Sequence, residues 1–412
     1  MITEVDLDNF KGIFEALVEL FPSQPWLKTV RDIEARKKRT PHAAFVSEQE
    51  NQLAYGLNAC SDFLEKRRVQ GTVEMVLSAL SVASQIVHLC SPVATGVRGP
   101  KDLPARFRAG FHDPAGMRAV LFELQVALSL YQGGCHVEWL DESSGSETFD
   151  MLVTPPGLDA FELECKSFSA DKGVGTTKHQ AAKLYDILRP QLEGFLPIPV
   201  ARVAVISVFL RQSIPTEQGA LAILAGELAI AIKDGERITG NAAATLEYNE
   251  IILPYAWDGD ATQVSLHAQQ LYPIGATLAT AWKDSQRGWV VLRAVVSGKE
   301  NGFWKEIEKV AKKSIKNQLT GKRPGALALH FGSETIESLQ SLSGLPDFNR
   351  AQKFAATLMV SDSCSHLAML AIFSESSSIE RSEDYLPSAS HIYHFDSPLG
   401  LYPNLGLSRY FK

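Results

Sequence analysis

The sequence is poor in cysteine, has no long uninterrupted hydrophobic run and carries no excess of positive charge. Its 412 residues include five cysteines, at Cys60, Cys90, Cys135, Cys165 and Cys364, and none of these forms a CxxC pair. The spacing therefore indicates neither a zinc site nor a disulfide framework, and it is typical of a protein from a reducing cytosol.

The most apolar stretches are interrupted by polar residues. Met75–Ala94 contains serine, glutamine and histidine, and Leu221–Ile232 contains Glu227. Neither stretch is typical of a membrane span, and the acidic start of the chain lacks the basic and apolar regions of a signal peptide. We therefore expect a cytoplasmic protein that does not associate with membranes.

The charge balance argues against a general nucleic-acid-binding protein but leaves room for a local basic surface. The net charge is −7 and the isoelectric point is about 5.9. The segment Phe303 to Leu319 has the spacing of a basic amphipathic helix. Its lysines are Lys305, Lys309, Lys312, Lys313 and Lys316. They are suited to gripping a nucleic-acid backbone, and the alternative is an ordinary solvated helix face.

Length and periodicity predict an α/β protein with more than one domain. Residues 1–100 show helical spacing and end near a linker candidate, Ser91–Pro104, so we expect an N-terminal helical domain there. A core domain is expected over 101–215 and a C-terminal α/β domain over 216–412. The strands expected in the last domain are Glu247–Pro254, Gly288–Val296, Ala326–Phe331, Ala355–Val360 and Leu367–Phe373.

The most informative stretch runs from Phe149 to Lys166, FDMLVTPPGLDAFELECK, and predicts two strands joined by a proline- and glycine-containing turn. Side chains alternate between the two faces of a strand, so Glu164 and Lys166 share a face and Cys165 takes the other. Asp150 lies on the first strand. If the strands pair as a hairpin, two carboxylates and one ammonium group converge. Two carboxylates can hold Mg²⁺, and a neighbouring lysine can orient a water and stabilise negative charge.

Asp150, followed after thirteen residues by Glu164-x-Lys166, resembles the motif of the PD-(D/E)xK nuclease superfamily. The resemblance implies a restriction-endonuclease-like core, α-β-β-β-α-β, with a mixed sheet flanked by helices. Its elements are expected between about Pro114 and Leu210, including a helix that Thr176 or Thr177 caps and that runs to about Leu192, and a strand over Ala201–Leu210. Phe149 replaces the proline of the motif.

The resemblance also implies an activity and a ligand set. Asp150, Glu164 and the backbone carbonyl of Cys165 would bind Mg²⁺ or Mn²⁺, and Lys166 would position the attacking water. The function implied is a metal-dependent DNA endonuclease of a restriction or phage-defence system. A homodimer and a partner protein of a defence system are compatible with this reading.

Two further residues enter the candidate site through the resemblance. Glu123 lies on the flank of the apolar stripe of a helix that Asp113 caps and Pro114 begins; relatives use an acidic residue on this helix at the metal. Gln180 lies on the helix expected after the ExK strand, where relatives carry a glutamine followed four residues later by tyrosine; here Tyr185 comes five later. A helix-surface carboxylate and an exposed glutamine are the respective alternatives.

Two other functions and one purely structural interpretation remain open. An RNase of the same fold would use the same residues, and an inactive binding or assembly module would keep the fold without catalysis. An ordinary hairpin with a Glu–Lys pair on its wet face is also compatible with the motif.

Overall fold

The structure is a computed structural model. It describes residues 9–66, 72–90, 99–140, 148–169, 172–173, 175–194, 196, 198–253, 260–272, 277–283, 288–296, 302–335, 350–375 and 391–411. Two compact units are present. Unit 1 comprises residues 1–31, 51–172 and 304–412, and unit 2 comprises residues 32–50 and 173–303. The expected linker at Ser91–Pro104 lies outside the described residues over 91–98.

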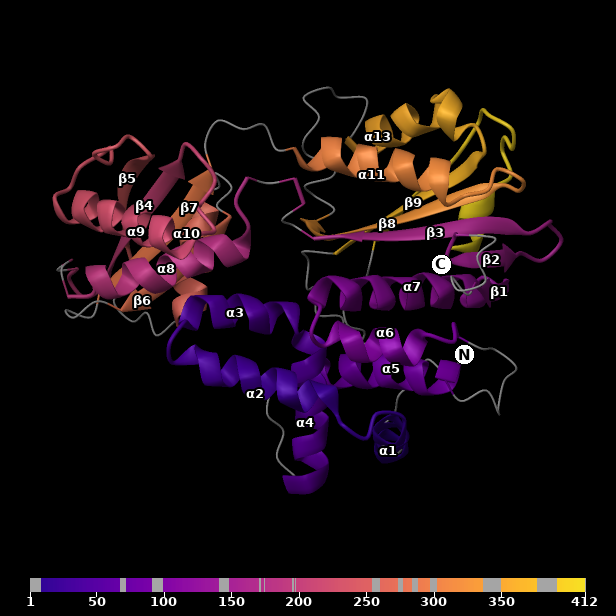
Figure 1. The fold of residues 1–412 in the computed structure, drawn as a ribbon, viewed down its shortest axis with the longest axis horizontal. Helices are drawn as coiled ribbons and strands as arrows, with labels where there is room; N and C mark the ends of the chain where they lie inside the picture. The colour runs from indigo at the N-terminus through magenta and orange to yellow at the C-terminus, as the bar shows by residue number, and fades with distance from the viewer. Residues whose placement is uncertain are drawn as a thin grey trace. The chain divides into compact units, whose positions relative to one another are not determined.

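Unit 1 is built on a six-stranded mixed sheet in the order β1-β2-β3-β8-β9-β10 (Figure 1). The strands are β1 (His136–Trp139), β2 (Met151–Thr154), β3 (Phe161–Phe168), β8 (Gly325–Thr335), β9 (Leu367–Glu375) and β10 (His391–Asp396). β1, β2 and β3 pair antiparallel, as do β9 and β10. β3, β8 and β9 pair in parallel, and strands paired in this way are usually covered on both faces.

Helices cover both faces of this sheet (Figure 1). On one face lies α7 (Pro114–Gln132), whose Phe122, Val126 and Leu130 pack on inward residues of the strands. On the other face lie α11 (Phe303–Asn317) and α13 (Arg350–Met359), where the Trp304 ring contacts the rings of Phe331 and Phe354. The helix α7 starts as predicted, since Asp113 Oδ1 accepts a hydrogen bond from Ala115 N at 3.1 Å.

The N-terminal part is helical, as predicted from its spacing. Its helices are α1 (Phe10–Leu20), α2 (Pro25–Lys37), α3 (Pro41–Glu50), α4 (Gln52–Lys66), α5 (Val73–Cys90) and α6 (Leu103–Gly110). Within unit 1, the aromatic side chains of Phe21, Trp26, Phe107 and Phe111 pack together in one core that extends to α7. The helix α6, which is not evident from the sequence, is thereby fixed beside α7.

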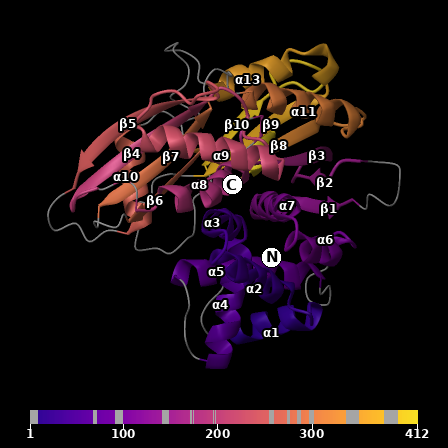
Figure 2. The same cartoon turned by 60° about the vertical axis from the view of Figure 1, so that its left-hand side comes forward.

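Unit 2 has a separate four-stranded sheet in the order β5-β4-β7-β6 (Figure 2). Its elements are α8 (Lys178–Leu192), β4 (Arg202–Leu210), α9 (Gln218–Lys233), β5 (Ala244–Ile252), α10 (Ala261–Leu271), β6 (Leu278–Lys283) and β7 (Trp289–Val296). Alternate residues of β4 face opposite cores: Ile206 and Val208 pack with α8 and α9, whereas Val203 and Val205 pack with α10. This unit also contains α3, which packs on α8.

The architecture confirms the α/β class and corrects the expected domain organisation. The helix and strand expected to follow Lys166 in the core are α8 and β4, and they belong to unit 2. The chain leaves unit 1 after β3 and re-enters it at α11, and β8 takes the place beside β3. A boundary at residue 215 therefore does not separate the units. The apolar run of β4 suits any buried strand, so its composition does not specify its sheet.

One expected strand is a helix. Ala355–Val360 falls mostly within α13, where Ala351, Ala355 and Leu358 are buried at helical spacing. A short apolar run has no periodicity long enough to distinguish the two states, and the helical repeat becomes clear only with Ala351 included.

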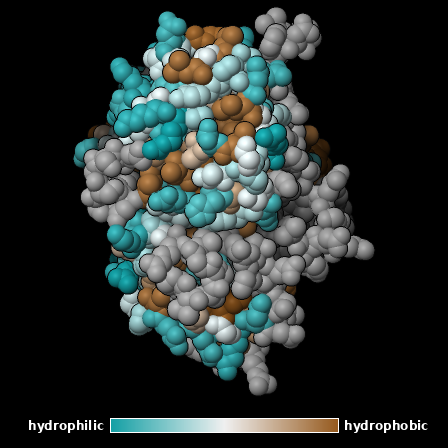
Figure 3. All heavy atoms as spheres, turned by 90° about the vertical axis from the view of Figure 1, so that its right-hand side faces the viewer, coloured by the Kyte–Doolittle hydropathy of each residue, from teal (hydrophilic) through white to brown (hydrophobic). Residues whose placement is uncertain are grey.

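The described helices include none that is both long and apolar enough to cross a membrane. Figure 3 shows one end of the protein, where hydrophilic and hydrophobic side chains are interspersed among the coloured residues. Single exposed apolar side chains of this kind are ordinary on protein surfaces.

Candidate functional site

The hairpin formed by β2 and β3 brings the motif residues together. Met151 pairs with Leu163 and Val153 with Phe161, so continuing the register by one residue places Asp150 opposite Glu164. The turn that sets this register contains Gly157, whose φ of 75° lies in the left-handed region. As predicted, Phe161, Leu163 and Cys165 of β3 face the core under α7. Glu164 and Lys166 therefore point to the other face.

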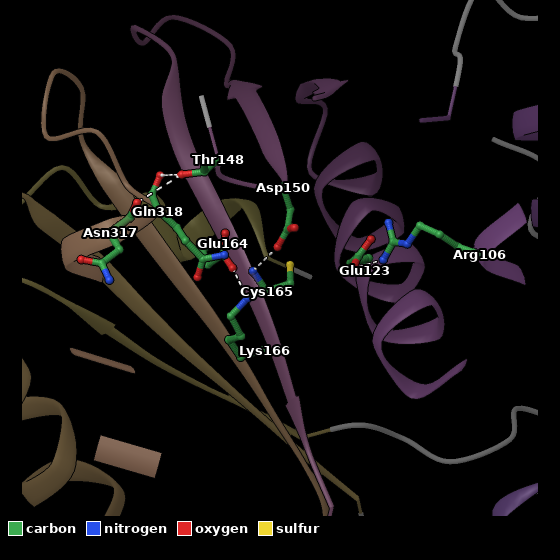
Figure 4. Close-up of polar contacts among 9 residues, drawn as sticks. All are labelled: Arg106, Glu123, Thr148, Asp150, Glu164, Cys165, Lys166, Asn317 and Gln318. Atoms are coloured by element: carbon green, nitrogen blue, oxygen red, sulfur yellow. Dashed lines mark hydrogen bonds and ion pairs between the residues drawn. The ribbon is translucent and has the colours of Figure 1, made fainter. Parts of the chain in front are cut away.

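Asp150 lies directly before β2 and is held against the backbone of β3. Its Oδ2 accepts a hydrogen bond from Cys165 N at 2.7 Å, and its backbone N donates to Leu163 O at 3.1 Å. Figure 4 shows the Asp150 carboxylate beside the β3 backbone at Cys165. The β2 ladder begins at Met151, opposite Leu163, so the Asp150 carboxylate binds the β3 backbone just beyond the end of the paired strands.

Glu164 is a fully buried carboxyl with one paired and one unpaired oxygen. Its side chain has 0% exposure; Oε1 accepts a hydrogen bond from Lys166 Nζ, and Oε2 has no partner among the described residues. Burial, followed by the charge of Asp150, raises the pKa of Glu164 to about 8. Burial acts to lower the pKa of Lys166, but the charge and hydrogen bond of Glu164 outweigh it, so that this pKa is raised. An unpaired buried carboxylate oxygen is costly unless a cation or donor approaches it.

Glu123 projects from α7 toward Asp150 and is held by an arginine from α6 (Figure 4). Arg106 donates a hydrogen bond to Glu123 Oε1 at 2.5 Å, and Glu123 is buried. Burial raises the pKa of Glu123 to about 7; the hydrogen bond from Arg106 opposes this rise, and the charge of Asp150 adds to it. The structure therefore places Glu123 in the electrostatic field of Asp150 and Lys166 rather than on an open helix surface. Arg106 was missed, because neither α6 nor its docking on α7 is evident from local sequence.

The C-terminal end of α11 is tied to both strands of the hairpin. Thr148, two residues before Asp150, donates from Oγ1 to the backbone oxygens of Asn317 at 3.2 Å and Gln318 at 3.1 Å. On β3, the fully buried Glu162 accepts hydrogen bonds from the backbone N and the hydroxyl of Thr320. These hydrogen bonds connect the segment before β2, and Glu162 of β3, to the end of α11 and the residues that follow it.

Two further sequence-predicted site residues are Gln180, on α8, and Cys165, on β3. Gln180 lies in unit 2, where its amide is engaged in helix capping: Oε1 accepts from Thr177 N at 2.8 Å and Nε2 donates to Ile214 O at 3.2 Å. The helix that carries Gln180 belongs to unit 2, whereas the trio belongs to unit 1, so the role of Gln180 stays a prediction. Cys165 faces the core, and burial raises the pKa of its thiol well above the usual value. Only its backbone carbonyl is suited to the role predicted for it.

The arrangement of oxygens bears on a metal ion. Among the described residues, no group of three or more His, Cys, Asp or Glu side chains could hold one. The oxygen donors present are the carboxylates of Asp150 and Glu164. The Cys165 carbonyl lies on the same edge of β3 as the Cys165 N–H, which donates to Asp150 Oδ2. Mg²⁺ is commonly bound through one or two carboxylates and keeps several waters, so this donor set and the unpaired Glu164 oxygen fit that ion.

Comparisons with protein-family models, with curated proteins and with solved structures found no match.

Proposed function

We propose that unit 1 is a metal-dependent phosphodiesterase, a DNA endonuclease whose site consists of Asp150, Glu164 and Lys166. The observation that carries the proposal is the buried Glu164 carboxyl, whose unpaired oxygen lies across the hairpin from Asp150 and whose other oxygen holds Lys166. An ordinary surface Glu–Lys pair would not bury the carboxyl completely.

The order of elements in unit 1 supports a restriction-endonuclease-like core. α7, β1, β2 and β3 follow one another, and the required helix and parallel strand are α11 and β8. In this proposal, residues 173–303 are an insertion between the ExK strand and the helix that follows it. The insertion explains why the local sequence after Lys166 suggests the wrong helix.

The residues of the site have distinct roles in the proposed reaction. Asp150, Glu164 and the Cys165 carbonyl would hold Mg²⁺ or Mn²⁺, which lowers the pKa of a water and offsets charge on a phosphoryl oxygen. The Lys166 ammonium, freed from Glu164, would hydrogen-bond the attacking water and stabilise the negative charge that develops at the phosphorus centre. Glu123, with a pKa of about 7, is able to exchange a proton near neutral pH, and Arg106 keeps its carboxyl oriented toward Asp150.

The test is cleavage of labelled duplex DNA and of labelled RNA in Mg²⁺, in Mn²⁺ and in EDTA. The expected result is cleavage of DNA in the presence of either metal and none in EDTA, with loss of activity in Glu164→Gln. Cleavage of RNA alone would replace the DNA endonuclease with an RNase of the same site. Absence of metal-dependent cleavage of both nucleic acids would contradict the proposal and favour a binding module.

A further inference from the structure

The outer face of α11 and the loop after it are rich in basic side chains. Residues 303–323 contain seven basic and two acidic side chains, in a chain whose net charge is −7. α11 buries Phe303, Ile307, Ala311 and Ile315. Its exposed side carries four lysines, which we call the α11 lysine row: Lys305, Lys309, Lys313 and Lys316.

The lysine row keeps most of its charge unpaired. Glu306 lies 3.8 Å from Lys309, whose side chain is 75% exposed, and such an exposed pair is weak. Among the described residues, no ion pair is present for Lys305, Lys313 or Lys316. The other glutamate of the helix, Glu308, pairs with Lys312, which is outside the row.

The row leads to the site. Residue 316 is adjacent to Asn317, whose backbone oxygen accepts the Thr148 hydroxyl two residues before Asp150. From Lys305 to Lys316 the helix rises about 16 Å, with steps of three or four residues that rise about 5–6 Å each. A duplex presents one phosphate per strand about every 3.4 Å along its axis, so successive lysines are matched to phosphates one or two steps apart.

The chemistry of the row favours a duplex backbone over a single strand. Proteins that bind single strands combine positive charge with aromatic side chains on which bases stack. Here the two aromatic residues of α11 are turned inward: Phe303 is buried, and Trp304 packs on Phe331 and Phe354. Lysines act as point charges on phosphates and read no sequence.

From this geometry we infer that the α11 lysine row binds the phosphate backbone of duplex DNA and guides it to the Asp150–Glu164 site. The inference rests on the proposed function for its choice of DNA as the duplex. It predicts binding that is independent of sequence and strongly dependent on salt.

The test is fluorescence anisotropy with a labelled 30-base-pair duplex in EDTA, over a range of KCl concentrations. Binding without metal separates this surface from catalysis. The row variant replaces Lys305, Lys309, Lys313 and Lys316 by glutamine. A control variant makes the same replacement at four exposed lysines elsewhere and so changes the net charge equally. These lysines are Lys28, Lys101, Lys178 and Lys233. Circular dichroism checks that both variants are folded.

The row variant should bind more weakly than the control variant, and its plot of log affinity against log salt should be less steep by about 3–4, since each lost phosphate contact contributes about 0.9. Equal slopes for the two variants, or no duplex binding by the parent, would overturn the inference. If the row variant lost binding to an RNA duplex but kept its binding to the DNA duplex, the choice of DNA would be overturned. If the parent cleaves DNA but the row and control variants have equal salt slopes, only the inference about the lysine row is refuted. If binding depends on the lysine row but the parent does not cleave DNA, only the proposed function is refuted.

Discussion

Replacing Glu164 by glutamine should make the metal-free protein more stable than the parent at alkaline pH and not at acidic pH. The substitution keeps an oxygen that accepts the Lys166 hydrogen bond and removes a carboxyl that is buried beside Asp150. Glutamine has the same shape, so the change isolates the charge.

The magnitude follows from the pKa of Glu164, which burial and then the charge of Asp150 raise from 4.5 to about 8. Below pH 4.5 the carboxyl is protonated in both the folded and the unfolded chain, and it does not affect stability. As the pH rises toward 8, the unfolded chain releases this proton and the folded chain keeps it, so the free energy of unfolding falls. At about 1.4 kcal/mol per tenfold difference in proton affinity, the full loss is on the order of 5 kcal/mol.

The assay is urea denaturation of parent and Glu164→Gln in EDTA at several pH values from 5 to 8.5, followed by circular dichroism and tryptophan fluorescence. The quantity of interest is the difference between the two proteins at each pH, in which titrations common to both cancel. The new amide adds a constant offset, because its NH₂ group takes the place of the unpaired Oε2. The difference should shift in favour of the variant by roughly 3 kcal/mol between pH 5 and pH 8. A difference that does not change with pH would refute the burial of a high-pKa carboxyl at this position.

Three further predictions concern neighbouring parts of the protein. Arg106→Met leaves a buried carboxyl without its partner and should lower the free energy of unfolding of unit 1 by about 1–3 kcal/mol in urea denaturation. Asp102→Asn removes a more exposed carboxylate that lies 4.0 Å from Arg106 Nε, and it should change this free energy by less than about 0.5 kcal/mol. Gly173→Ala should destabilise unit 2 by at least about 1 kcal/mol more than Gly235→Ala, since both glycines have positive φ but only the first would place its new Cβ within 2.7 Å of backbone; equal losses would contradict the close approach. Under the proposed function, the Mn²⁺ affinity of the parent in calorimetry should rise with pH until Glu164 is ionised near pH 8, with release of a proton; an affinity independent of pH would remove Glu164 from the ligands.

Local patterns predicted the part of the site that lies on one continuous hairpin. The alternation of Phe161, Leu163 and Cys165 with Glu162, Glu164 and Lys166 determines which side chains face the core, and the turn before them sets the register. These properties extend over fewer than twenty residues, so the sequence carries them without reference to the rest of the chain.

The rest of the site depends on contacts between distant segments. Arg106 reaches Glu123 only because α6 packs on α7, and Glu162 meets Thr320 only because β8 returns beside β3. The sequence does not show where the chain leaves unit 1, since Lys178–Leu192 is as suitable for a helix on one sheet as on another. The helix that carries Gln180 belongs to unit 2, so its predicted role depends on a helix outside the unit that holds the trio.

The measurement that tests the central claim most directly compares Lys166→Ala with the parent in Mn²⁺ binding and in single-turnover cleavage of duplex DNA, on the same preparations at pH 8.5. The lysine is assigned to the transition state and not to the metal. The account predicts a Mn²⁺ dissociation constant within roughly tenfold of the parent's and a cleavage rate lower by at least about a hundredfold. Cleavage by Lys166→Ala at the parental rate would contradict the assignment of Asp150, Glu164 and Lys166 as the site of phosphodiester hydrolysis.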